Sequence, residues 1–170
     1  MQQHFRMFAA YNRWANAEVY DAAGALREAG RARNVGGLFG LMLGTRNPLL
    51  VSGRIWMKRF TGEGEAPKAL DTVLFTDFAR LRAAREAEDR RIVEWIETLT
   101  PKALAGRFTY MTVTDLRTVS QRLSPALAHF FNHQTHHRGQ AHMILTALGK
   151  PSLSLDLIYF QRTPEGREFA

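Results

Sequence analysis

The sequence contains no cysteine. This absence excludes disulfides, thiolate zinc sites, iron–sulfur clusters and cysteine nucleophiles, so any metal would need nitrogen or oxygen ligands. Long apolar runs are also missing, because no stretch approaches the ~20 residues that a membrane-spanning helix requires. Residues 1–5 lack the basic and apolar segments of a signal peptide. We therefore expect a cytoplasmic protein that does not associate with membranes.

Acidic residues are fewer than basic ones, 16 against 23, which gives a formal net charge of +7. Such a surplus can indicate nucleic-acid binding. The basic residues are nevertheless scattered and interleaved with acidic ones, as in residues 80–91, and none forms part of a recognisable nucleic-acid motif. We therefore expect a solvated, arginine-rich surface without direct nucleic-acid binding.

The most informative stretch is rich in histidine and lies at residues 129–142, which hold five of the six histidines. Apolar residues flank it at helical spacing: Leu123, Leu127, Phe130, Ala141, Ile144 and Leu148. His133 and His137 fill the gap in this stripe, so both imidazoles should face whatever the helix packs against. Two histidines four residues apart can bind one metal ion, or they can be hydrogen-bonded core residues. A metal site would need a third protein ligand from another helix.

Amphipathic periodicity predicts four long helices, over residues 4–27, over 37–60, from between 71 and 76 to 100, and from 120 or 124 to 149. The third could be capped by Asp71 or Thr76 and stopped by Pro101, and Pro48 should kink or break the second. Residues 106–120 favour an extended crossover or a short hairpin, and the apolar tail 153–160 should pack back. We expect an all-α four-helix bundle that forms a single domain over residues 1–170.

Two charged residues, Arg85 and Glu88, fall in the middle of the apolar stripe of the third helix. They could form an internal ion pair, face a wet cavity, or extend from the edge of the stripe into solvent. The sequence leaves these alternatives open.

Several motifs together resemble the DinB family, and they extend over nearly the whole chain. The most specific is His133-Gln134-Thr135-His136-His137-Arg138-Gly139-Gln140. The others are Tyr11-Asn12-Arg13-Trp14-Ala15-Asn16, Gly44-Thr45, Arg54-Ile55-Trp56 and Leu155-Asp156-Leu157-Ile158-Tyr159. The resemblance implies a DinB-like helical bundle, a homodimer, and a nickel or zinc ion held by three histidines.

Two of these histidines correspond to His133 and His137, but the third is replaced. The family context Gly-Thr-x-x-His reads here Gly44-Thr45-Arg46-Asn47-Pro48, and an aspartate common in the family five residues later is Gly53. Because proline offers no donor atom, we expect a degenerate site that binds metal weakly or carries no cofactor.

Substitutes for the missing ligand are His129, Asn47 and Glu88. With such a substitute, the resemblance implies an alternative function, a metal-dependent thiol-transferase-type enzyme that activates a small thiol. Arg85 or Arg138 would then hold an acidic co-substrate. Without one, the same cavity would bind a small molecule or nothing.

Overall fold

The structure is a computed structural model, and it describes residues 1–26 and 48–170. The long helices are α1 (Gln2–Gly24), α3 (Pro48–Thr61), α4 (Phe78–Thr98) and α6 (Leu123–Ala147). Short helices α5 (Pro101–Ala105) and α7 (Leu157–Gln161), the 3-10 helix η1 (Arg167–Phe169) and strands β1 (Arg107–Met111) and β2 (Thr118–Arg122) complete the described elements. The protein is therefore predominantly helical, as the periodicity predicted. None of the described helices combines the length and apolar character needed to cross a bilayer.

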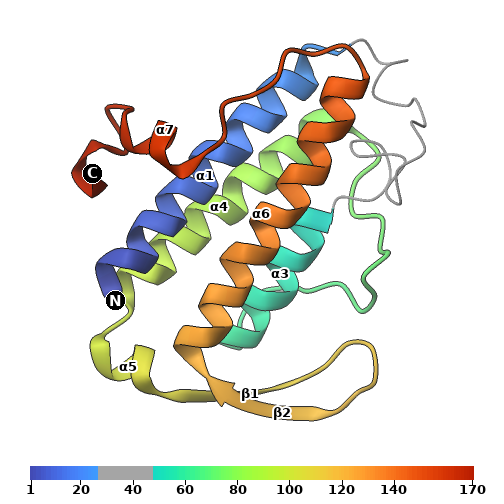
Figure 1. Ribbon diagram of the computed structural model, residues 1–170. Helices are drawn as coiled ribbons and strands as arrows, with labels where there is room; N and C mark the ends of the chain where they lie inside the picture. The colour runs from blue at the N-terminus through green and yellow to red at the C-terminus, as the bar shows by residue number, and fades with distance from the viewer. Residues whose placement is uncertain (27–47) are drawn as a thin grey trace.

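The long helices lie side by side (Figure 1). Helix α1 packs along α4 and α6, and α3 packs against α4 and α6. At one end of the helices their shared interior is aliphatic and aromatic, and it includes Phe5, Met57, Ile92, Leu127 and Phe130. Burying such side chains contributes roughly 1.5–3 kcal/mol each relative to exposure.

Two helix starts differ from the sequence expectation. Helix α4 begins at Phe78, because the Asp77 carboxylate accepts the Arg80 N–H at 2.8 Å; neither Asp71 nor Thr76 caps it. Pro101 does not simply end α4. It opens α5, where the Thr100 hydroxyl accepts the Ala103 N–H at 3.1 Å.

Within the described residues, α3 begins at Pro48. The predicted helical residues before it lie outside the described part of the chain.

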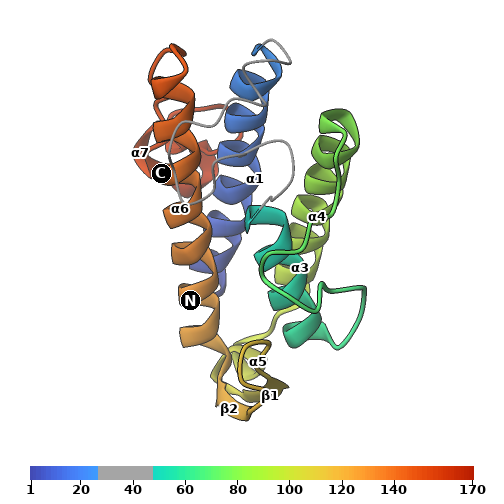
Figure 2. The ribbon, with the colours of Figure 1, turned by 90° about the vertical axis from the view of Figure 1, so that its right-hand side faces the viewer.

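The crossover before α6 is an antiparallel hairpin in which Arg107 pairs with Arg122 and Met111 with Thr118. It lies with α5 at one end of the long helices (Figure 2). Tyr110 contacts Trp56 of α3, with ring centroids 5.6 Å apart, so the hairpin also holds α3.

The chain leaves α6 at Gly149, whose φ of 83° is the left-handed conformation that ends many helices. The following tail packs back on α1, as predicted. Phe160 is fully buried against Tyr11 and Ala15, and Leu155 O accepts the Tyr11 hydroxyl at 2.7 Å.

Candidate metal and ligand pocket

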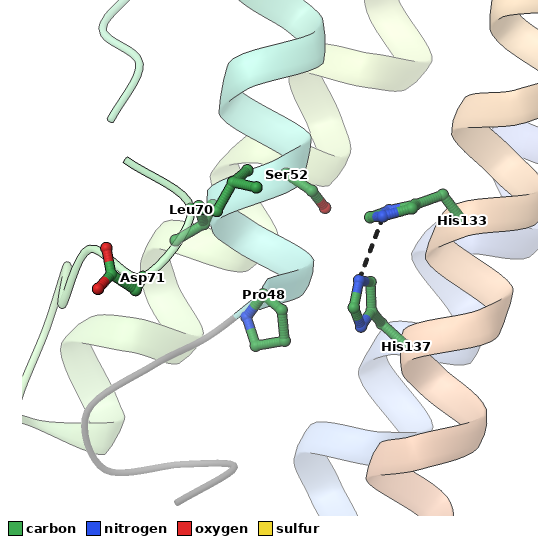
Figure 3. Close-up of a pocket in the computed structure, with 7 residues that line it drawn as sticks. Pro48, Ser52, Leu70, Asp71, His133 and His137 are labelled. Atoms are coloured by element: carbon green, nitrogen blue, oxygen red, sulfur yellow. Dashed lines mark hydrogen bonds between the residues drawn. The ribbon is translucent and has the colours of Figure 1, made fainter. Parts of the chain in front are cut away.

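A pocket of about 340 Å³ lies between α3 and α6. Helix α3 contributes Pro48, Val51 and Ser52; α6 contributes His133 and His137; and the loop 62–77 contributes Leu70 and Asp71. Figure 3 shows both imidazoles extending from α6 toward the first turns of α3. The two principal predicted residues therefore share one cavity.

The histidine pair lies at the edge of the buried face of α6, not in its centre. The buried residues in the centre are Gln134 and Arg138, whereas His133 and His137 are half-buried. Each histidine comes one residue before one of these buried residues, and successive residues of a helix are rotated by about 100°. The two imidazoles are therefore turned from the bundle interior toward α3. The expectation that the pair fills the apolar stripe was wrong by this rotation, although the rings do face a neighbouring helix.

The two rings are hydrogen-bonded through their Nε2 atoms, which are 3.3 Å apart. His137 Nδ1 lies 2.8 Å from the Gln140 amide oxygen, so this nitrogen carries a proton and donates. His137 Nε2 is then the acceptor and His133 Nε2–H the donor. This assignment leaves His133 Nδ1 unprotonated, and that buried atom has no hydrogen-bond partner among the described residues. Gln140 thus fixes the His137 tautomer whose lone pair is on Nε2, and His133 Nε2 would bind a metal only after its proton had moved to Nδ1.

Burial keeps both rings neutral at pH 7. It lowers the pKa of His133 to about 4, with further lowering from the neighbouring His137, His129 and His136. Burial also lowers the pKa of His137, against the opposing hydrogen bond to Gln140. Neutral imidazole is the form that binds a metal.

The spacing of the pair fits two ligands of a tetrahedral metal. Zinc–nitrogen bonds of ~2.0–2.1 Å at a tetrahedral angle place two nitrogens about 3.3–3.4 Å apart, and the two Nε2 atoms lie 3.3 Å apart. Within the described residues, no third protein ligand accompanies them. Across residues 1–26 and 48–170, no group of three or more histidine, aspartate or glutamate side chains is arranged to hold a metal.

Two of the proposed substitute ligands, His129 and Glu88, do not reach the pair. His129 is exposed and stacks near Trp56, with centroids 5.1 Å apart. It lies eight residues before His137, about 12 Å along the helix, too far for both to bind one ion. Glu88 is buried on α4 and pairs with Arg91 at 3.0 Å. Asn47 lies outside the described residues.

The two α3 residues that differ from the family motif, Pro48 and Gly53, play different roles. Pro48 lines the pocket, where its ring offers apolar surface and no donor. Gly53 does not line the pocket. A Cβ atom built on Gly53 would lie 2.9 Å from Arg85 Nη1, so this glycine makes room for a guanidinium of α4. Gly53, a candidate pocket residue from the sequence, therefore lies against Arg85 and not among the lining residues.

Arg85 is buried, but its partner is Asp89 and not Glu88. It donates from Nε and Nη2 to the Asp89 carboxylate at 3.1 and 2.8 Å, and from Nη1 to Leu49 O at 3.0 Å. Of the alternatives for the α4 stripe, the structure thus shows a buried Arg85–Asp89 ion pair, whereas Glu88 pairs with the partly exposed Arg91. Because the N–H groups of its guanidinium are engaged in these hydrogen bonds, Arg85 does not offer the co-substrate contact considered from the sequence.

Arg138 is also buried away from the pocket. It donates to Asn12 Oδ1 and, at 2.9 Å, to Thr135 Oγ1, and its guanidinium lies 5.0 Å from the Tyr11 ring centroid. Asn12 and Asn16 in turn donate to Asp89 at 3.0 Å. One polar layer therefore connects α1, α4 and α6, and Gln134 extends it to Ser52 on α3 at 3.2 Å.

Three polar residues of the pocket or its support were not predicted as site residues. Gln140 belongs to the His-x-x-x-His-Arg-Gly-Gln motif, which was the available signal. Ser52 carries no distinctive signal, and Asp71 was considered only as a helix cap. Asp71 is exposed on a loop whose position depends on tertiary structure.

The comparison with protein families agrees with the motifs. The model described as DinB family matches residues 1–167. Neither the curated proteins nor the solved structures contain a match. Because the family match covers almost the entire chain, the protein belongs to the DinB family.

Proposed function

We propose that the α3–α6 pocket is a reduced form of the family's metal site, in which His133 and His137 bind a divalent ion weakly and no histidine completes the set. The 3.3 Å separation of the two Nε2 atoms carries the proposal, because it suits both as ligands of one ion. The Gln140 hydrogen bond supports it by orienting His137.

Weak binding follows from the ligand count. Loss of a residue that merely orients a ligand reduces affinity by roughly 10–100-fold, and loss of a ligand should cost more. Pro48 supplies no donor in its place, and its ring makes that side of the pocket apolar. The open coordination positions would be occupied by water or a small molecule.

A second candidate is a thiol-transferase-type enzyme. The pocket of about 340 Å³ beside the histidine pair favours it, since a small thiol could enter. A bound nickel or zinc ion would lower the pKa of a coordinated thiol. The chain's own part would be to orient the ligands through Gln140 and to limit water with Pro48, Val51 and Leu70. Asn47 is the remaining substitute ligand from the sequence.

Cobalt titration tests the metal proposal, because the visible absorption of Co²⁺ reports its ligands. Tag-free protein should show a weak, saturable spectrum that disappears in a His133→Ala/His137→Ala variant. His129→Ala serves as a matched control, because it removes an exposed histidine of the same helix. Binding that survives loss of both pocket histidines would refute the proposal.

The proposal also includes a single four-helix-bundle domain over residues 1–170 that forms a homodimer in the cytoplasm. The mutual packing of α1, α3, α4 and α6 supports the bundle. Sedimentation equilibrium tests the dimer, which a purely monomeric protein at micromolar concentration would contradict.

A further inference from the structure

The α3–α6 pocket combines two kinds of polar group with apolar walls. In Figure 3 the histidine pair and Asp71 lie on opposite sides of Pro48, and the Asp71 carboxylate is turned away from the imidazoles. Pro48, Val51 and Leu70 supply apolar surface. A molecule filling this pocket would therefore meet hydrogen-bonding rings, an aliphatic wall and a separate carboxylate.

Asp71 is the charged residue among the described residues of this lining. Among residues 1–26 and 48–170, no side chain or backbone N–H donates to its carboxylate, and no cation pairs with it. The turn that carries it is nevertheless held, because Ala69 O accepts the Thr72 hydroxyl at 2.7 Å. Asp71 therefore lines the pocket as an exposed residue on the far side of Pro48 from the imidazoles.

The two buried arginines Arg85 and Arg138 do not neutralise the negative charge of Asp71 at the pocket. Arg85 and Arg138 face the buried polar layer and donate to Leu49 O, Asp89 and Asn12. The histidine pair shares one hydrogen bond between its Nε2 atoms, which requires an unprotonated acceptor ring. The described lining thus favours a positive ligand over a negative one.

We infer that the pocket binds small organic cations of the amine class. The ammonium group pairs with Asp71, the apolar body packs on Pro48, Val51 and Leu70, and a polar group at the other end reaches His133 and His137. The inference rests on the proposed function in that it uses the same pocket, but it does not require a bound metal. Since Asp71 is exposed, its contribution is that of a surface ion pair, roughly two- to five-fold in affinity.

Three probes that share a phenylethyl group test the inference: 2-phenylethylamine, 2-phenylethanol and 3-phenylpropionate. Each is titrated into metal-free protein in the presence of a chelator at pH 7, and binding is followed by the ring-proton NMR signals of His133 and His137. The amine should bind severalfold more tightly than the alcohol, and the carboxylate most weakly. The preference should shrink as salt is added.

Asp71→Asn should remove the preference for the amine without abolishing binding of the alcohol. Glu65→Gln is the matched control, because it removes the same charge from the same loop at a residue outside the pocket lining, and it should leave the preference intact. Equal affinities for the three probes, tighter binding of the carboxylate, no binding of any probe, or an unchanged preference in Asp71→Asn would each overturn the inference.

The experiments distinguish failure of the amine-binding inference from failure of the metal-binding proposal. Cobalt binding depends on His133 and His137, and its titration is carried out without the organic probes. A cobalt spectrum with no amine preference would reject the ligand class alone. Amine selectivity without cobalt binding would reject the metal and keep the pocket.

Discussion

Replacing Gly53 by alanine should destabilise the protein, although the same change in most helices is stabilising. Alanine is favoured over glycine by ~1 kcal/mol in a helix interior. Here the new Cβ would lie 2.9 Å from Arg85 Nη1, whereas ordinary contact begins at 3.4 Å. The guanidinium must therefore move by about 0.5 Å, on this contact distance alone.

Arg85 has little freedom to move, because it is 1% exposed and held by Asp89 and Leu49 O. A hydrogen bond to a charged group contributes ~1.5–3 kcal/mol, and breaking a buried ion pair costs ~3–5 kcal/mol. We expect the substitution to break the hydrogen bond to Leu49 O and to weaken the Asp89 pair, while alanine's helix preference offsets part of this cost. The free energy of unfolding should therefore fall by about 1–2 kcal/mol.

Urea unfolding followed by circular dichroism measures this effect. Gly139→Ala is the matched control, because Gly139 is in α6 and its added Cβ would meet nothing within 4 Å. That variant should be stabilised by up to ~1 kcal/mol. In an Arg85→Met background, Gly53→Ala should no longer destabilise. The reasoning is refuted if Gly53→Ala stabilises the wild-type protein as much as Gly139→Ala does.

Three further predictions concern the pocket and the tail. Pro48→His should raise cobalt affinity by at least tenfold, and adding Gly53→Asp should give no further gain because position 53 faces Arg85; a gain that needs both changes would contradict this geometry. The pKa of His133 falls from 6.5 to about 4 on folding, so the unfolded chain binds more protons between these values and stability decreases as pH falls through this range. After discounting for half-burial, wild type should lose on the order of 1 kcal/mol more than His133→Leu between pH 7 and 4.5 in urea unfolding; parallel losses would contradict it. His142 Nε2 accepts the Leu153 N–H at 2.8 Å, so His142→Leu should accelerate hydrogen exchange at Leu153, whereas unchanged exchange would show that this bond does not hold the tail.

Much of the fold could be predicted because local signals are strong. Gly149 followed by Pro151 marked the end of the histidine helix, and the β-favouring residues before it marked the hairpin. The spacing of His133 and His137 indicated that both rings share one face, and they do share one pocket.

The rest depends on contacts that periodicity does not specify. Apolar spacing located the buried face of α6 only to about one residue, because Gln134 and Arg138 are buried as members of a polar layer. Arg85 could equally have paired with Glu88 or Asp89, which lie three and four residues away on the same helix. Asp71 reaches the pocket through the path of a loop, which no local pattern determines.

The central claim is that His133 and His137 form a two-ligand site that holds metal weakly. Elemental mass spectrometry on tag-free protein, before and after dialysis against a chelator, tests it most directly. We predict substoichiometric nickel or zinc that dialysis removes, and none in His133→Ala/His137→Ala. Stoichiometric metal that resists the chelator would contradict the account, because it would require a third strong ligand.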